Sequence, residues 1–215
     1  MRSVISECVL RELARTFLGE SSGILNTESC GLEAQPDAPP HGDAVLALEH
    51  LGVPVCDTGA SRAEEEHLRR CDLAITMTRQ QSYVMANLFP ENMNRYFSLI
   101  EINGAIETLL ERRGESIDSG DWIEQARGMP SDDLDRRLRE AAAFLATQRR
   151  EFMKPLAGVP LNIYELMTLF STCFHQVSGI HDPIGGASAE KFKCADLLDK
   201  EVTMLLHGLL ALACT

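Results

Sequence analysis

The chain has 215 residues, of which 45% are hydrophobic, and its 32 acidic against 20 basic residues give a formal net charge of −12. This composition is that of an ordinary globular protein and excludes the disordered, fibrous and disulfide-scaffold classes. No apolar run approaches the ~18 residues that a membrane span needs, and the acidic surface would repel nucleic acids and anionic lipids. We therefore expect neither nucleic acid nor a membrane as a partner.

The cysteines and histidines give no sign of a disulfide framework or a metal site. The seven cysteines form no Cys-x-x-Cys pair, and the six histidines form no His-x-x-x-His motif. We find no secretory leader and expect a cytoplasmic protein with free thiols, no cofactor and no metal.

The first hundred residues alternate short apolar runs with helical patterns. Apolar residues at helical spacing predict a helix over residues 3–15. Residues 73–77 are the clearest strand, because a short apolar run is bounded there by polar residues. Further strands are predicted at residues 23–27, 53–55 and 96–102, and further helices at 43–50, 63–70 and 81–89. This order predicts an α/β fold with a small parallel sheet flanked by helices in three layers.

The section of residues 103–179 breaks that alternation and is predicted to be a helical insertion. It contains a charged helical pattern over residues 132–152 and an apolar one over residues 162–175. Residues 188–213 then form a long final helix with an apolar stripe. The insertion could offer a surface for a protein partner.

Several segments, taken in order, resemble the low molecular weight protein tyrosine phosphatase family of bacteria. The start, Met-Arg-Ser-Val-Ile-Ser-Glu, is similar to the end of the family's phosphate loop, and Cys-Asp-Leu-Ala-Ile-Thr-Met-Thr at residues 71–78 is similar to one of its strands. Further similarity lies in residues 28–31, Pro36 and Pro39, residues 88–91, and the Asp-Pro-Ile-Gly-Gly segment at residues 182–186. The resemblance covers residues 1–102 and 180–215, which we expect to form the phosphatase-like domain.

The resemblance implies hydrolysis of phosphorylated proteins, carrying phosphotyrosine or phosphoarginine, by a cysteine nucleophile. In that chemistry Arg2 would clamp the phosphate, Ser3 would lie in the substrate-binding loop, and Asp182 would be the general acid. Simpler interpretations exist for all three: Arg2 as a solvated residue, Ser3 as a helix N-cap, and Asp182 as part of a turn.

The nucleophile is where the chain departs from the family. The family's Cys-x5-Arg loop would place the cysteine six positions before Arg2, so as written the chain lacks this residue and the first strand, and we expect it to be inactive. Two explanations stay open: a start codon assigned too late, or a shortened product without this activity. We favour the first, because the other family segments still form a complete catalytic frame.

Three alternatives remain beside this interpretation. Cys56 and Arg62 form an internal Cys-x5-Arg match, although Asp57 would place a like charge beside a phosphate. Arsenate reduction on the same fold would need a close cysteine pair, and none is evident in the sequence. A non-catalytic relative could instead act as a binding module.

Overall fold

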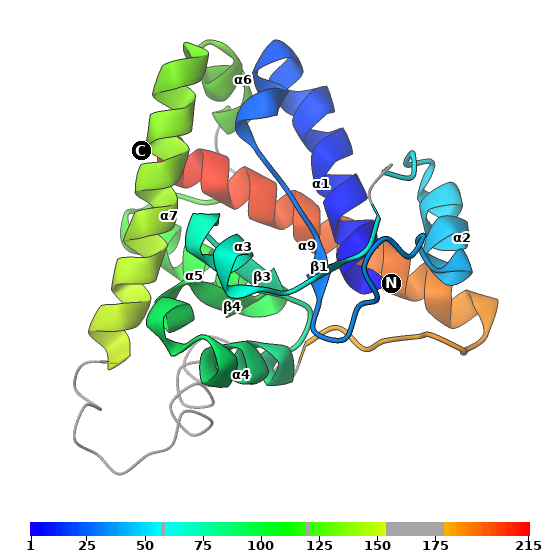
Figure 1. The fold of residues 1–215 in the computed structure, drawn as a ribbon. Coiled ribbons are helices and arrows are strands. Elements are labelled where there is room, and N and C mark those ends of the chain that lie inside the picture. Colours follow the sequence, from blue (N-terminus) through cyan, green and yellow to red (C-terminus); the bar gives the residue numbers. More distant parts are fainter. Residues whose placement is uncertain (57–58, 119–120, 154–178) are drawn as a thin grey trace.

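The computed structural model describes residues 1–56, 59–118, 121–153 and 179–215 (Figure 1). Its helices are α1 (Arg2–Leu18), α2 (Gly42–Leu51), α3 (Glu65–Arg70), α4 (Arg79–Leu88), α5 (Leu99–Arg112), α6 (Trp122–Arg127), α7 (Ser131–Met153) and α9 (Ser188–Cys214), with two 3-10 helices, η1 (Gly19–Ile24) and η2 (Pro90–Arg95). The strands are β1 (Cys30–Gly31), β2 (Ser61–Arg62), β3 (Ala74–Thr76) and β4 (Tyr96–Ser98).

The strands form two separate parallel pairs, which confirms the α/β class with small parallel sheets flanked by helices. β1 pairs with β2, with Cys30 opposite Ser61, and β3 pairs with β4, with Ala74 opposite Tyr96. In Figure 1, the β3–β4 pair lies between α4 and the helices α5 and α9. The loop that precedes α9 contacts this sheet just after the end of β3.

Two of the expected strands are wrong, and the other two are shorter than expected. Residues 19–24 form η1 in place of a strand over 23–27, and residues 53–55 have no strand partner within the described ranges. β4 ends at Ser98 because Ser98 and Glu101 form a capping box that starts α5. The apolar run at residues 96–102 thus predicted that a strand begins there, but the polar residues Ser98 and Glu101 determine where the strand ends.

The predicted helices that fall within the described ranges are confirmed with small shifts of their ends. The helix expected at residues 3–15 is α1, that at 132–152 is α7, and that at 188–213 is α9. α4 begins at a capping box in which the Thr78 hydroxyl accepts from the Gln81 backbone. α2 ends at Gly52, whose left-handed φ of 67° suits a residue without a Cβ atom.

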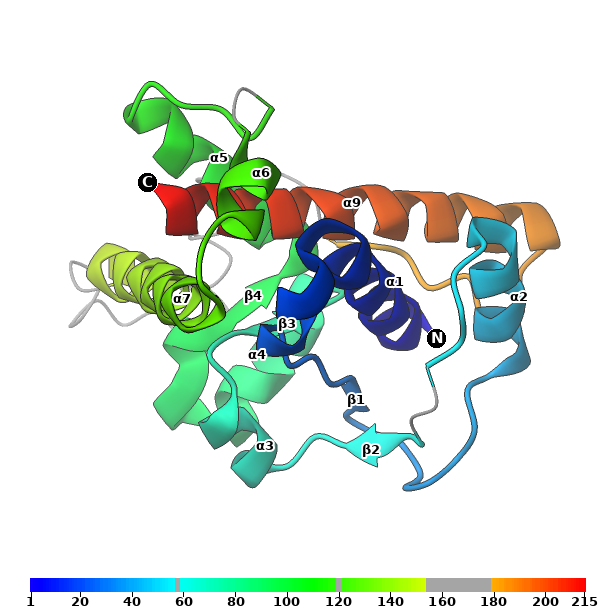
Figure 2. The same cartoon turned by 90° about the horizontal axis from the view of Figure 1, so that it is seen from above.

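The long helix α9 is the centre of the core. It packs against α1, α2, α5, α6 and α7 (Figure 2). The contact with α5 is close, because a Cβ atom on Gly208 would lie 2.7 Å from the Ile106 side chain. Buried side chains of α1, α5, α7 and α9 belong to one apolar cluster, which includes Ile5, Ile106, Leu145 and Leu198.

A buried arginine attaches α7 to the β3–β4 pair. The Arg149 side chain is 1% exposed, its guanidinium stacks 4.6 Å from the Phe97 ring centroid, and Nη1 donates to the Tyr96 carbonyl. Its Nη2 lies 3.5 Å from Glu101 Oε1. Burial lowers the pKa of Arg149 and the Glu101 charge opposes that shift. The helix α7, in the middle of the expected insertion, is therefore bound to the sheet by charge as well as by apolar packing.

The predicted division into a phosphatase-like domain and an insertion over residues 103–179 stays a prediction. The apolar helix expected at residues 162–175 lies outside the described residues. Within the described ranges, no helix is both long enough and apolar enough to span a bilayer.

Candidate functional site

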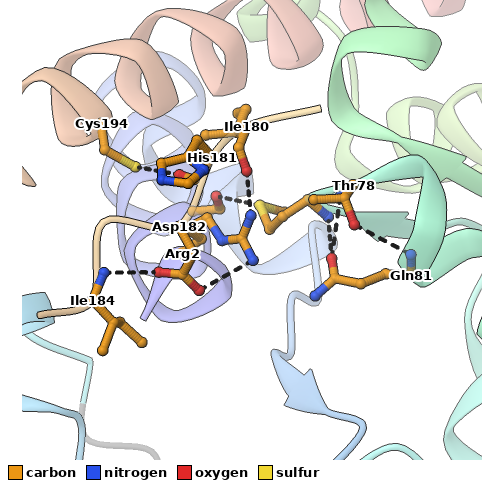
Figure 3. A network of polar contacts seen from close by, with 10 residues as sticks. Arg2, Thr78, Gln81, Ile180, His181, Asp182, Ile184 and Cys194 are labelled. Atoms are coloured by element: carbon orange, nitrogen blue, oxygen red, sulfur yellow. Dashed lines mark hydrogen bonds and ion pairs between the residues drawn. The ribbon is translucent and has the colours of Figure 1, made fainter. Parts of the chain in front are cut away.

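The structure brings together Arg2 and Asp182, which are 180 positions apart in the chain. Arg2 is the first residue of α1, and Asp182 lies in the loop before α9. Arg2 Nη2 lies 3.1 Å from Asp182 Oδ2, and Nη1 donates to the Ile180 carbonyl (Figure 3). The Arg2 side chain is 11% exposed and that of Asp182 is 36% exposed. The two charges therefore meet at a surface that a ligand can reach from the Asp182 side.

The loop that carries Asp182 is attached to the end of β3. Gly179 forms an antiparallel bridge with Thr78, and the Ile180 N–H donates to the Met77 carbonyl at 2.9 Å. Gly179 has a φ of +114°, and a Cβ atom there would lie 2.7 Å from the Met77 carbonyl oxygen. Only glycine adopts this conformation without strain and allows so close a backbone approach. These contacts fix the loop beside the start of α1.

The Asp182 side chain also organises its own turn. Its Oδ1 atom accepts from the Ile184 N–H at 3.3 Å, and the Gly186 N–H donates to the Pro183 carbonyl at 2.9 Å. Asp182 is thus a turn residue, as the simpler interpretation proposed, and one oxygen still faces Arg2. The turn presents the carboxylate and does not exclude a role for it in catalysis.

A second ion pair supports this turn from α2. Lys191 Nζ lies 2.7 Å from Asp43 Oδ1, and both side chains are 14% exposed. The Lys191 hydrogen bond lowers the pKa of Asp43, and a hydrogen bond from the Gly185 backbone adds to this effect. Asp43 therefore connects α2, α9 and the 182–186 turn, and no motif in the sequence predicts this contact.

Ser3 does not cap the helix, so the N-cap interpretation is wrong. α1 begins at Arg2, its N-cap residue is Met1, and no side-chain cap hydrogen bond is present there. Ser3 therefore lies within the first turn, because the helix starts one residue earlier than expected. Its predicted place beside a bound phosphate stays a prediction.

Cys194 is a neighbour of the site that sequence reasoning did not identify. Its Sγ atom donates to the His181 carbonyl at 3.6 Å (Figure 3). Burial raises the pKa of Cys194, whereas the Arg2 charge acts in the opposite direction. No motif predicts this position, because it depends on how α9 crosses α1.

The Gln81 side chain forms hydrogen bonds with the backbone of the segment that follows β3. Its Oε1 atom accepts from the N–H groups of Met77 at 3.0 Å and Thr78 at 3.1 Å (Figure 3). These bonds hold in place the backbone to which Gly179 and Ile180 are attached.

The internal Cys-x5-Arg match lies in a different environment from Arg2 and Asp182. Cys56 is buried and its N–H donates to Cys8 Sγ at 3.0 Å, while Arg62 is exposed at the end of β2. Residues 57–58 lie outside the described ranges. Across the described ranges, no group of three His, Cys, Asp or Glu side chains could hold a metal ion.

Sequence comparison connects the chain with protein phosphatases. The sequence model of the low molecular weight phosphotyrosine protein phosphatases matches residues 1–109. A protein-arginine-phosphatase of Bacillus subtilis is 29% identical over 153 residues, which cover 69% of this chain and 92% of the relative.

Structural comparison gives the same fold. A mutant of YwlE from Bacillus subtilis has a TM-score of 0.54 at 17% identity, covering 95% of this chain and 88% of that one. A YwlE arginine phosphatase mutant with a phosphorylated active-site serine has a TM-score of 0.55 at 17% identity, with 95% and 86% covered. The low molecular weight protein tyrosine phosphatase from T. tengcongensis scores 0.51 at 16% identity, with 96% and 90% covered. With a family match over residues 1–109 and these folds, the chain belongs to the low molecular weight phosphotyrosine protein phosphatase family.

Proposed function

We propose that Arg2 and Asp182 are the phosphate clamp and the general acid of a protein phosphatase site. The observation that carries this proposal is the 3.1 Å ion pair between them. Each residue matches a family motif position, and the two reach one another only in the folded chain. Family membership supports protein phosphatase activity, and the arginine phosphatase relative favours phosphoarginine, with phosphotyrosine as the other candidate substrate.

The geometry supports a binding step in which a phosphate takes the place of the Asp182 carboxylate beside Arg2. A guanidinium donates parallel hydrogen bonds to a phosphoryl group, and Arg2 Nη2 now faces a partly exposed carboxylate that a phosphate can displace. Arg2 also opens α1, a helix of 17 residues, whose first N–H groups favour an anion. The displaced Asp182 would then be the acid that protonates the leaving group.

Catalysis by the family mechanism needs a thiolate beside Arg2. The thiolate attacks phosphorus, the leaving oxygen or guanidine nitrogen takes a proton from the acid, and water then hydrolyses the phosphocysteine. The family motif places that thiolate six positions before Arg2. We therefore propose that the 215-residue chain holds the clamp and the acid and does not by itself catalyse turnover.

The separation of the strands supports the same proposal. β1–β2 and β3–β4 are two parallel pairs with no ladder between them among the described strands. The family resemblance implies an additional internal strand, ending in the phosphate loop. Such a strand could join the two pairs, each of which consists of two parallel strands.

The test compares two forms of the chain in hydrolysis of a phosphoarginine peptide and a phosphotyrosine peptide. One is the 215-residue chain, and the other carries the in-frame residues encoded upstream of Met1. We expect turnover only in a longer form that supplies Cys-x5-Arg, with losses of about 100-fold or more for Arg2→Ala and for Asp182→Asn.

Two results would contradict the proposal. Turnover by the 215-residue chain that Cys56→Ser abolishes would assign the nucleophile to the internal match. If no upstream cysteine is encoded and neither peptide is hydrolysed, the binding-module alternative replaces the catalytic one.

A further inference from the structure

Two buried thiols from distant parts of the chain lie against one another outside the candidate site. Cys8 lies on α1 and is 1% exposed, and Cys56 follows α2 and is 9% exposed. Both are free thiols. No Cys-x-x-Cys motif predicts this pair, because the two cysteines come together only when α1 packs on α2.

The contact between them is close. The Cys56 N–H donates to Cys8 Sγ at 3.0 Å, which places this sulfur at most about 4.5 Å from the Cys56 Cα atom. In disulfides the two Cβ atoms are about 3.5–4.5 Å apart. The Cys8 sulfur therefore lies near enough to Cys56 for the two side chains to approach one another.

We propose that Cys8 and Cys56 form a disulfide when the protein is exposed to a peroxide. Hydrogen peroxide oxidises one thiol to a sulfenic acid and is itself reduced to water. The second thiol then attacks that sulfur, the S–S bond forms, and the sulfenic oxygen leaves as a second water. Two electrons and two thiol hydrogens pass from the cysteine pair to the peroxide.

The surroundings decide the order and the speed of these steps. Burial, followed by the Cys56 side-chain hydrogen bond, raises the pKa of Cys8 to about 12, so Cys8 is a thiol at neutral pH. Cys56 is the more exposed of the two, and we therefore assign it the first oxidation. The reaction is slow in the folded protein, because peroxide reacts with thiolates.

The cross-link has a predictable effect on stability. It would join α1, which carries Arg2 at its start, to the segment after α2, closing a long loop of the chain. Such a loop removes much of the entropy of the unfolded state, and we expect the melting temperature to rise by about 5–10 °C. The proposal is independent of the phosphatase assignment, since the hydrogen bonds and ion pair of Arg2 and Asp182 within the described ranges involve neither thiol.

The test is peptide mapping of the full chain after treatment with hydrogen peroxide and alkylation of the remaining thiols. Trypsin places Cys8 in the peptide 3–11, and both Cys30 and Cys56 in the peptide 16–62. We expect these two peptides to be joined, with the loss of two hydrogen atoms, and to separate on reduction. Cys30→Ser is the matched control, because it removes the other thiol of the larger peptide and should leave the cross-link unchanged.

The same experiment can overturn the proposal in three ways. The cross-link should disappear in Cys56→Ser; if it persists there, or is lost in Cys30→Ser, the pair has been assigned wrongly. Recovery of Cys8 as an alkylated thiol or a sulfinic acid, after the exposed cysteines have reacted, would also contradict it. Finally, a cross-linked wild type that melts below the reduced protein would show that the native contact cannot accommodate the bond.

Discussion

Arg149 and Arg2 each pair with a carboxylate and donate to a backbone carbonyl, but the two pairs differ in exposure and in packing. Arg149 is 1% exposed and Glu101 3%, whereas Asp182 in the other pair is 36% exposed. Arg149 also stacks on Phe97 and donates to the Tyr96 carbonyl. A phosphate could not replace Glu101 without opening the core, but it can replace Asp182 from solvent. The same two functional groups therefore serve structure in one place and are available for ligand binding in the other.

The largest effect is expected when the buried pair is broken. Arg149→Met removes the cation that lies 3.5 Å from the buried Glu101 carboxylate, and we expect a loss of about 3–5 kcal/mol in the free energy of unfolding. Chemical denaturation with a fluorescence readout measures this loss. In the double variant Arg149→Met with Glu101→Gln, stability should partly recover, because Gln keeps an acceptor for the Ser98 N–H that Glu101 Oε2 now binds at 3.0 Å. No recovery would show that the charge of Glu101 is not the cause.

A smaller loss of stability is expected for a substitution of Gly179, where its backbone lies close to that of Met77. Gly179→Ala imposes a side chain at a φ of +114°, against the Met77 carbonyl, and should cost about 1–3 kcal/mol. Gly185→Ala is a useful control, because its φ is +78° but its Cβ atom would meet nothing within 4 Å. Thermal melts of both variants separate the cost of the conformation from that of the contact. Equal losses would contradict the close approach to Met77.

Removal of Arg2 should leave the fold nearly intact. Arg2→Ala breaks a partly exposed ion pair, and such pairs contribute about 1 kcal/mol or less. A loss comparable with that of Arg149→Met in the same denaturation experiment would mean that Arg2, too, is a structural residue. The contrast between the two arginines would then disappear.

The smallest effect is expected for Asp43, whose contribution to stability depends on pH in the acidic range. The pKa of Asp43 is lowered, chiefly by Lys191, so the folded state holds its proton less tightly than the unfolded state. The pair therefore stabilises the protein above the ordinary pKa of Asp43, and this contribution is lost as the pH falls through the lowered value. Asp43→Asn should reduce the melting temperature slightly at pH 7 and by less at pH 2. An equal difference at both pH values would rule out the charge as the cause.

The long amphipathic elements could be predicted from the sequence, whereas most contacts between elements could not. The stripe of α9 and the bounded apolar run of β3 predict their own secondary structure, because the period and the flanking residues are local. Residues 53–55 also look like a strand, but strand formation depends on a partner that the local pattern does not specify. Tertiary packing decided that outcome.

The candidate site shows the same limit. Arg2 and Asp182 were identified through their resemblance to family motifs, and no spacing in the sequence indicates that they touch. Cys194, Asp43 and the pair of Cys8 and Cys56 carry no motif at all. Their positions follow from the crossing of α9, α1 and α2, which only the folded chain defines.

Phosphate binding to the 215-residue chain tests the central claim most directly. ³¹P NMR titration with inorganic phosphate should detect weak binding that Arg2→Ala reduces by about 10-fold or more, the value of a charged hydrogen bond. Asp182→Asn should strengthen binding several-fold, because it removes the carboxylate that competes for Arg2. Arg62→Ala, an exposed arginine at the internal Cys-x5-Arg match, should have no effect. Loss of binding in Arg62→Ala together with unchanged binding in Arg2→Ala would contradict the assignment of the site.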